Sequence, residues 1–172
     1  MMLMSEETRQ ALVHLLGEFF GHNSEADNLA YNLAIADYPI ISDIYHHSFA
    51  HFFTGNEMAD GISGIMDQLD ARAVRLANPA HDTDYQGNLE AIFADNKAMC
   101  ERCREAIIAT IDLADMNGDP EVRIFAEELL MKFMPYYKQA RVWDVFCKRY
   151  KDDWKGFEVH FEDITTFIPV AK

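Results

Sequence analysis

The chain has 172 residues, of which 49% are apolar, and its formal charge is −14 from 29 acidic and 15 basic residues. This length corresponds to one domain that can bury a sizeable core without disulfides. The acidic balance excludes a general nucleic-acid binder, which needs clustered Lys and Arg, and it disfavours anionic membrane surfaces.

The cysteine count and the N-terminal residues bear on the compartment. Three cysteines, Cys100, Cys103 and Cys147, are too few for a disulfide framework and indicate a reducing environment. The first residues include Glu6 and Glu7 and no cationic flank, and no stretch approaches the ~20 apolar residues of a membrane span. We therefore expect a cytoplasmic protein with neither a secretory signal nor a membrane segment.

The first half of the chain shows helical periodicity between sparse breaks. Residues 6–20 predict a short amphipathic helix, and Gly21 to Ser24 predict a break after it. Residues 25–53 predict a long helix with a kink at Pro39. After a turn at Thr54-Gly55-Asn56, residues 57–77 predict a third helix.

The second half repeats this pattern and then changes period. Residues 78–87 predict a loop, and residues 88–117 a fourth helix that Gly118 ends. Asp119-Pro120 predicts the start of a fifth helix to about residue 152, with Asp as N-cap and Pro at the first helical position. Apolar and polar residues alternate over 157–162, which predicts an extended, strand-like tail.

These elements predict an all-α, up-and-down four-helix bundle in a single domain, residues 1–172. The bundle covers about residues 25–152, with a short N-terminal helix before it and an extended C-terminal tail, about 153–172, after it. One connection, 78–87, has to run along the bundle, and ten extended residues reach about 33 Å.

Two groups of side chains could bind a metal. His46, His47 and His51 cluster late in the second helix, and His47 and His51 share a face at a spacing that suits one metal ion. The alternative is that they are surface or interface histidines.

An acidic row on the third helix forms the second group: Glu57, Asp60 and Asp67, with Asp70 one step round. Carboxylates that point inward from facing helices are the ligands of di-iron bundles, whereas a solvated face is the plainer interpretation. The small residues Gly64 and Ala71 in this row indicate a close helix approach, as at a dimer contact.

Other motifs carry little chemistry. Cys100 and Cys103 lie in mid-helix, where no helix N-terminus lowers a thiol pKa, so we interpret them as packing or surface thiols and not as a redox pair. The sequence has no Gly-rich phosphate loop, no G-x-S-x-G and no H-E-x-x-H.

Four segments, taken in order, resemble the Dps-like mini-ferritins. Residues 48–55 (SFAHFFTG) are similar to that family's N-F-H-W-x-x-x-G, and residues 66–78 (MDQLDARAVRLAN) to its D-x-x-A-E-R-A-x-x-L-G-G. Residues 30–38 are similar to the start of its first bundle helix, and residues 104–122, with Asn117-Gly118-Asp119, to its third helix and the following acidic turn. The loop at 78–87 is too short for the small extra helix that the family has there.

This resemblance implies a ferritin-like fold and a homo-oligomeric shell, a dodecamer, that stores iron and oxidises Fe(II) with peroxide or oxygen. The family's oxidation site lies between two subunits and uses two histidines, an aspartate and a glutamate. In a gapless alignment the two histidines fall on Ala50 and near Asn56, the aspartate on Asp67 and the glutamate on Ala71. Asp67 is therefore the one ligand that this sequence retains. Either the site is lost, or iron binds through His47, His51, Glu57, Asp60 and Asp67.

Three functions remain open from the sequence. The first is a Dps-like iron-binding and iron-storage protein with a degenerate or relocated ferroxidase site. The second is a non-catalytic helical bundle used for assembly or partner binding, and the third is a bundle with another cofactor in its core. We expect no direct DNA binding, because residues 1–8 contain no Lys or Arg.

Overall fold

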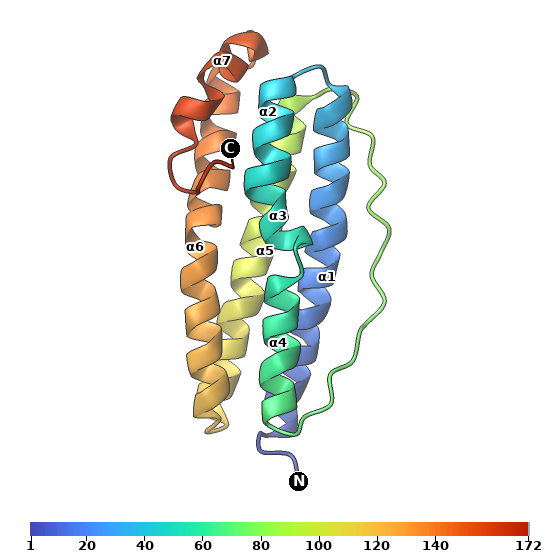
Figure 1. The fold of residues 1–172 in the computed structure, drawn as a ribbon, viewed down its shortest axis with the longest axis vertical. Helices are drawn as coiled ribbons and strands as arrows, with labels where there is room; N and C mark the ends of the chain where they lie inside the picture. The colour runs from blue at the N-terminus through green and yellow to red at the C-terminus, as the bar shows by residue number, and fades with distance from the viewer. Residues whose placement is uncertain (172) are drawn as a thin grey trace.

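The computed structural model describes residues 1–171, and these residues form helices and loops with no strand. Four long helical rods stand side by side, and a short helix lies at one end (Figure 1). The second rod consists of several consecutive segments. The elements are α1 (Glu6–Ile35), α2 (Pro39–Ile44), the π-helix η1 (Tyr45–Ala50), α3 (His51–Thr54), α4 (Glu57–Gln68), α5 (Leu89–Met116), α6 (Pro120–Arg149) and α7 (Trp154–Ile164).

The topology is two antiparallel hairpins joined by one long crossover (Figure 1). The first rod, α1, runs opposite to the second, α2 to α4, and the crossover then returns along the outside of α1 to the start of α5. The crossover spans residues 69–88, twice the predicted loop, because α4 ends at Gln68 and not at 77. None of the helices in the described part is long and apolar enough to cross a membrane.

The predicted break at Gly21 to Ser24 is wrong, because α1 continues through it as one helix of 30 residues. The predicted long helix over residues 25–53 with a kink at Pro39 is also wrong: the chain reverses direction at residues 36–38, where Asp37 has φ 63°, and Pro39 begins the separate helix α2. A proline is tolerated at the first helical position but disfavours helix in the residue before it. Thus α1, which begins at Glu6, is itself the first bundle helix, and there is no separate short leading helix.

The predicted turn at Thr54-Gly55-Asn56 is a break without a reversal: α3 and α4 continue in the same direction on either side (Figure 1). Asn56 has φ 59°, and the amide of Asn23 on α1 donates to its Oδ1 at 3.2 Å. The end of α4 is a left-handed residue, Asp70 (φ 53°), after which Ala71 N donates to Met66 O at 2.8 Å. Ala71 therefore lies outside α4 and shares no helical row with Gly64.

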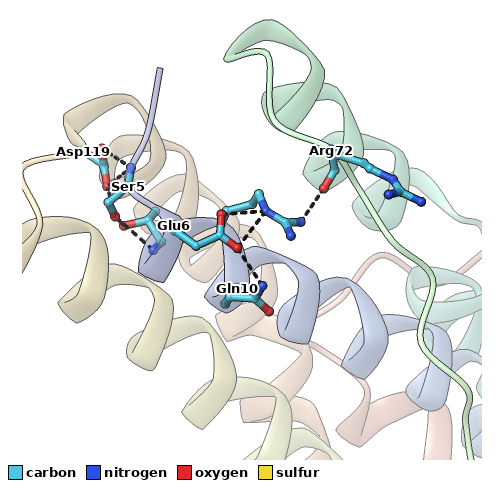
Figure 2. Close-up of polar contacts among 7 residues, drawn as sticks. Ser5, Glu6, Gln10, Arg72 and Asp119 are labelled. Atoms are coloured by element: carbon cyan, nitrogen blue, oxygen red, sulfur yellow. Dashed lines mark hydrogen bonds and ion pairs between the residues drawn. The ribbon is translucent and has the colours of Figure 1, made fainter. Parts of the chain in front are cut away.

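Helices α5 and α6 confirm the predicted fourth and fifth helices, but Asp119 has a different role from the predicted cap. Its carboxylate makes no bond to its own helix; it accepts from Ser5 N at 3.2 Å and from Ser5 Oγ at 2.9 Å (Figure 2). Ser5 is the N-cap of α1 and accepts from Thr8 N at 3.1 Å. Asp119 thus ties the start of α1 to the turn between α5 and α6.

Further contacts fasten the same end of the bundle. Glu6 Oε2 lies 3.0 Å from Arg9 Nε, and Arg9 Nη1 donates to Arg72 O at the start of the crossover at 2.8 Å (Figure 2). The N-terminal residues therefore hold both the crossover and the α5–α6 turn.

The predicted strand-like tail is wrong, because residues 154–164 form α7. Phe157 and Phe161 lie four residues apart, so they share one helical face; both are buried, whereas Val159 is exposed. Phe161 stacks on Trp143 with ring centroids 4.9 Å apart. The residues after α7 fold back along the bundle, and Ala171 N donates to Ser48 Oγ at 2.8 Å.

Candidate functional site

Aromatic rings fill the space between the four helices. Phe49 of η1 has its ring centroid 5.0 Å from that of Trp143 on α6, 5.3 Å from Tyr45 and 5.8 Å from Phe53. Phe93 of α5 lies 5.7 Å from Trp143. These contacts make this part of the interior aromatic and apolar.

The polar groups in this interior are few. Tyr45 Oη donates to Asn96 Oδ1 at 2.8 Å. Cys100 and Cys103 are fully buried, and burial raises the pKa of both thiols. The two cysteines are packing residues, one of the two interpretations that the sequence left open.

The buried carboxylates of Glu158 and Asp144 each accept at one oxygen, whereas Asp144 Oδ1 is buried without a hydrogen-bond partner. Glu158 Oε2 accepts from Ile40 N at 3.1 Å and so caps α2, and Asp144 Oδ2 accepts from Lys148 Nζ at 2.9 Å. Ferritin-like di-iron proteins need glutamates and Glu-x-x-His motifs that project inward from the helices. Within residues 1–171, no three His, Cys, Asp or Glu side chains come together to hold a metal ion. The bundle interior therefore does not fit a di-iron group.

Three of the five predicted metal-binding residues line one surface cavity of about 300 Å³. His47, His51 and Glu57 lie around it, together with Tyr136 and with residues 169–171 of the C-terminal segment. His47 Nε2 is 3.5 Å from Asp43 Oδ1, and the ring of His51 lies over Gly55, where a Cβ would be 3.5 Å from its Nε2. Asp60 and Asp67 are exposed on α4 and do not line this cavity.

The π-helix η1 determines which residues face this cavity. A π turn inserts one extra residue into a helix and rotates everything after it. Ala50 at the end of η1 is buried in the core, and His51, the next residue, is exposed. A histidine at position 50 would therefore enter the core, and the histidine of this segment faces solvent one residue later.

The sequence analysis missed a second cavity, of about 540 Å³, between α1, the crossover and α5. Its charged and imidazole-bearing lining residues are His14, Glu18, His22, Glu25, His81 and Arg102. His14, Glu18 and His22 are spaced by four residues, a signal of one helical face. The sequence analysis did not recognise this spacing, because it predicted a break at residues 21–24 that separated His22 from the helix carrying His14 and Glu18.

Comparisons with known proteins agree on the fold and on nothing finer. No family model and no curated protein matches the sequence. The structure is similar to the open pore ferritin of the hyperthermophilic archaeon Archaeoglobus fulgidus, with TM-score 0.80 and 12% identity over 96% of this chain and 98% of that chain. It is also similar to a humanized archaeal ferritin, with TM-score 0.81 and 12% identity over 94% of this chain and 97% of that chain.

The fold is ferritin-like. The all-α bundle that the sequence predicted is thereby confirmed, and at 12% identity the likeness establishes the fold alone. The crossover contains no helix among its described residues, although at residues 69–88 it is twice as long as the loop that the sequence predicted.

Proposed function

We propose that this chain is the subunit of a cytoplasmic, homo-oligomeric ferritin-like shell that binds and stores iron without a dinuclear centre inside each bundle. The observation that carries the proposal is a complete ferritin-like fold whose interior is filled by aromatic rings and buried thiols. In this proposal the fold serves as a building block, and iron is cargo held at acidic surfaces.

The charge and the surface cavity support iron as the cargo. A net charge of −14 attracts cations, and carboxylates and imidazoles are suitable ligands for Fe(II). His47, His51 and Glu57 surround the cavity of about 300 Å³, and the exposed carboxylates of Asp60 and Asp67 follow on α4. We propose these five residues as the surface along which iron binds.

Exposed apolar side chains support assembly with further copies. Tyr31 and Ile35 on α1 and Met131 on α6 are large, apolar and exposed, although the bundle has an ample core. Of these, Tyr31 and Ile35 lie four residues apart and so share one helical face of α1, which we propose as part of an interface with a second copy. A Dps-like dodecamer is the finer proposal, and twelve chains of 19.8 kDa would have a mass of about 240 kDa.

Two measurements on the metal-free protein test the proposal together. Light scattering gives the mass, and stepwise addition of Fe(II), with absorbance and oxygen uptake, gives iron stoichiometry and oxidation. We expect an assembly that takes up several iron ions per chain and oxidises them slowly, because no preformed pair of ligand sets exists. His47→Ala with His51→Ala should reduce early iron binding at least tenfold, and His160→Ala on α7 is the matched control. A monomer, or iron uptake that ignores His47 and His51, contradicts the proposal.

One observation favours a second candidate, a non-catalytic assembly or partner-binding protein. Aromatic rings and buried thiols occupy much of the interior, which suits a bundle that serves as a scaffold. Stoichiometry separates the two: an assembly that binds less than one iron ion per chain supports this second candidate. An absorption spectrum of the purified protein tests whether another cofactor is bound.

A further inference from the structure

A cavity of about 540 Å³ lies where the crossover passes along the outside of α1 (Figure 1). Two glycines of α1 let the crossover approach: a Cβ at Gly17 would be 3.4 Å from Leu76 Cδ1, and one at Gly21 would be 3.7 Å from Asn78 Oδ1. Glu18 lies between these glycines in the chain and lines the same cavity as Leu76 and Asn78. A cavity of this size accepts a small organic molecule.

His22 lines this cavity and carries a buried ring nitrogen without a hydrogen-bond partner. The residue is 2% exposed, and its unpartnered atom is Nε2. This atom lies 3.6 Å from Glu18 Oε2, which is too far for a hydrogen bond. A buried polar atom without a partner costs free energy, so a ligand that supplies the partner gains affinity.

The other side of the His22 ring is held by a buried ion pair. Its Nδ1 lies 3.8 Å from Glu25 Oε2, and Arg102 Nη2 lies 2.7 Å from Oε1 and 2.6 Å from Oε2 of the same carboxylate. Burial alone would raise the pKa of Glu25, but its interactions with His22 and Arg102 outweigh burial and lower it. A carboxylate beside Nδ1 favours the proton on that nitrogen, which leaves Nε2 as an acceptor.

The charges around the cavity leave one carboxylate without a permanent cation. Arg102 neutralises Glu25, whereas Glu18 has no Lys or Arg nitrogen within 4 Å among the described residues. Its neighbours are the imidazoles of His22 and, 3.6 Å from Oε1, of His14. The cavity therefore has one uncompensated negative charge, which favours a ligand with a single positive charge.

The crossover adds a third acceptor and an apolar wall to this site. Asn78 Oδ1 lies beside Gly21, the residue that precedes His22. Leu76, Ala77 and Pro79 are the apolar lining residues of the crossover. Acceptors and apolar groups in one cavity match a molecule that has a donor head and an apolar body, and a primary ammonium is a head with three N–H donors.

We propose that this cavity binds a small organic monocation with a primary ammonium head and an apolar body. The ammonium donates to Glu18 Oε2, His22 Nε2 and Asn78 Oδ1, and the body packs on Leu76. The Glu18 side chain is 32% exposed and can turn toward the cavity, so the ammonium enters between it and the His22 ring. Because the ligand contacts both α1 and the crossover, its binding fastens the two together.

Isothermal titration calorimetry of the full-length protein with benzylamine tests this site, because benzylamine carries one primary ammonium on an apolar ring. We expect one benzylamine per chain with a Kd of about 1 mM or lower. Benzyl alcohol and benzoate keep the ring but carry no charge or a negative charge, and both should bind at least tenfold more weakly. A higher thermal unfolding midpoint and slower amide exchange at Ala77 should accompany benzylamine binding.

Three variants locate the binding. Glu18→Gln removes the charge and keeps the size of the side chain, and it should weaken benzylamine binding at least tenfold. Leu76→Ala shortens the apolar wall and should weaken binding about threefold. The matched control is Glu127→Gln on α6, which removes a carboxylate 3.2 Å from Arg123 and should leave benzylamine binding unchanged.

The outcomes separate this site from the proposed iron surface and from general attraction of cations. Absence of benzylamine binding, equal binding of benzyl alcohol, or an affinity that Glu18→Gln leaves unchanged overturns the proposal. Equal weakening by Glu127→Gln also overturns it, because the amine would then follow the net charge of the chain. Leu76→Ala keeps the proposal testable if Glu18→Gln does not fold. The two cavities share no lining residue, so the His47→Ala, His51→Ala double variant should bind benzylamine like the parent, and failure of iron storage would leave this result as it stands.

Discussion

The two faces of helix α1 have opposite chemistry. One face places Phe19, Ala26 and Leu29 in the core, which consists mostly of apolar and aromatic side chains. The face under the crossover carries His14, Glu18 and Glu25, together with one edge of His22. The contrast teaches that a ferritin-like fold does not require a set of metal ligands between its helices: apolar packing dominates the interior, and most charged groups lie on the faces that meet solvent or the crossover.

This contrast has an energetic consequence. Stability should depend chiefly on the volume of the interior side chains and be insensitive to pH there. Beneath the crossover it should depend on charge, and hence on pH. The following substitutions test the contrast, and their expected effects on the free energy of unfolding decrease from first to last.

The largest effect is expected in the interior. Trp143 is fully buried, packs on Tyr45, Phe49 and Phe161, and donates from Nε1 to Thr165 Oγ1 at 3.0 Å. Trp143→Ala should lower the free energy of unfolding by about 3–5 kcal/mol, through lost burial and a cavity. Urea unfolding at fixed protein concentration measures this loss. The control is Val159→Ala, which shortens an exposed side chain on α7 and should change stability little. Equal losses in the two variants would refute the packing argument.

The second effect is expected beneath the crossover and depends on pH. Glu25 is 17% exposed and its partner Arg102 50% exposed, so solvent partly screens the pair, and Glu25→Gln should cost about 1–2 kcal/mol at pH 7. The folded-state pKa of Glu25 is lower than its ordinary value of 4.5. Its contribution is therefore fully present above about pH 4.5 and is lost as the pH falls through the folded pKa.

Unfolding curves at pH 7 and at pH 3 measure that dependence. The difference between parent and Glu25→Gln should shrink at the lower pH. Glu101→Gln, which removes a more exposed partner of Lys97 at 3.7 Å, is the matched control and should cost less at both values. A Glu25→Gln cost that does not vary with pH would mean that the charge beneath the crossover is unimportant.

Local sequence signals predicted the helices whose starts and ends are set by neighbouring residues. Asn117-Gly118-Asp119-Pro120 indicated the turn between α5 and α6, and the structure has it there. The prediction of a strand-like tail was wrong because Phe157 and Phe161 lie four residues apart. That spacing fits the two-residue period of a strand as well as one face of a helix, so alternation alone could not distinguish the two. The predicted break at Gly21 was wrong because a single glycine lowers helix propensity by only about 1 kcal/mol, and the buried residues on both sides of it, such as Phe19 and Ala26, keep α1 continuous.

The candidate sites were less predictable than the fold. His47, His51 and Glu57 were found because they are close in sequence, and they line one cavity. The π turn that buries Ala50 and exposes His51 has no sequence signature. His22, His81 and Arg102 are each at least 21 residues from the next in the chain, and only the path of the crossover brings them together.

The third effect compares two helix N-caps. Ser5 caps α1 and also binds Asp119 across the bundle end (Figure 2), whereas Asn88 caps α5 through Ala91 N alone, at 3.1 Å. Ser5→Ala should cost about 1 kcal/mol or slightly more, and Asn88→Ala about 1 kcal/mol or less. Urea unfolding of both variants gives the comparison. A smaller loss for Ser5→Ala would show that the tie to the α5–α6 turn adds no stability.

The smallest effect concerns Gly64 on α4, where the surface is open and the proposed assembly can be tested apart from folding. A Cβ at Gly64 would meet nothing within 4 Å in the single chain, so Gly64→Ala should stabilise the helix by about 0.5–1 kcal/mol. Gly64→Phe should leave the circular dichroism of the subunit unchanged for the same reason. If α4 packs against a second copy, as its small residue suggests, the Phe variant should lower the mass measured by light scattering. An unchanged mass would exclude a close contact at this position. The surface that joins the copies would then be the one that carries the exposed Tyr31 and Ile35 of α1.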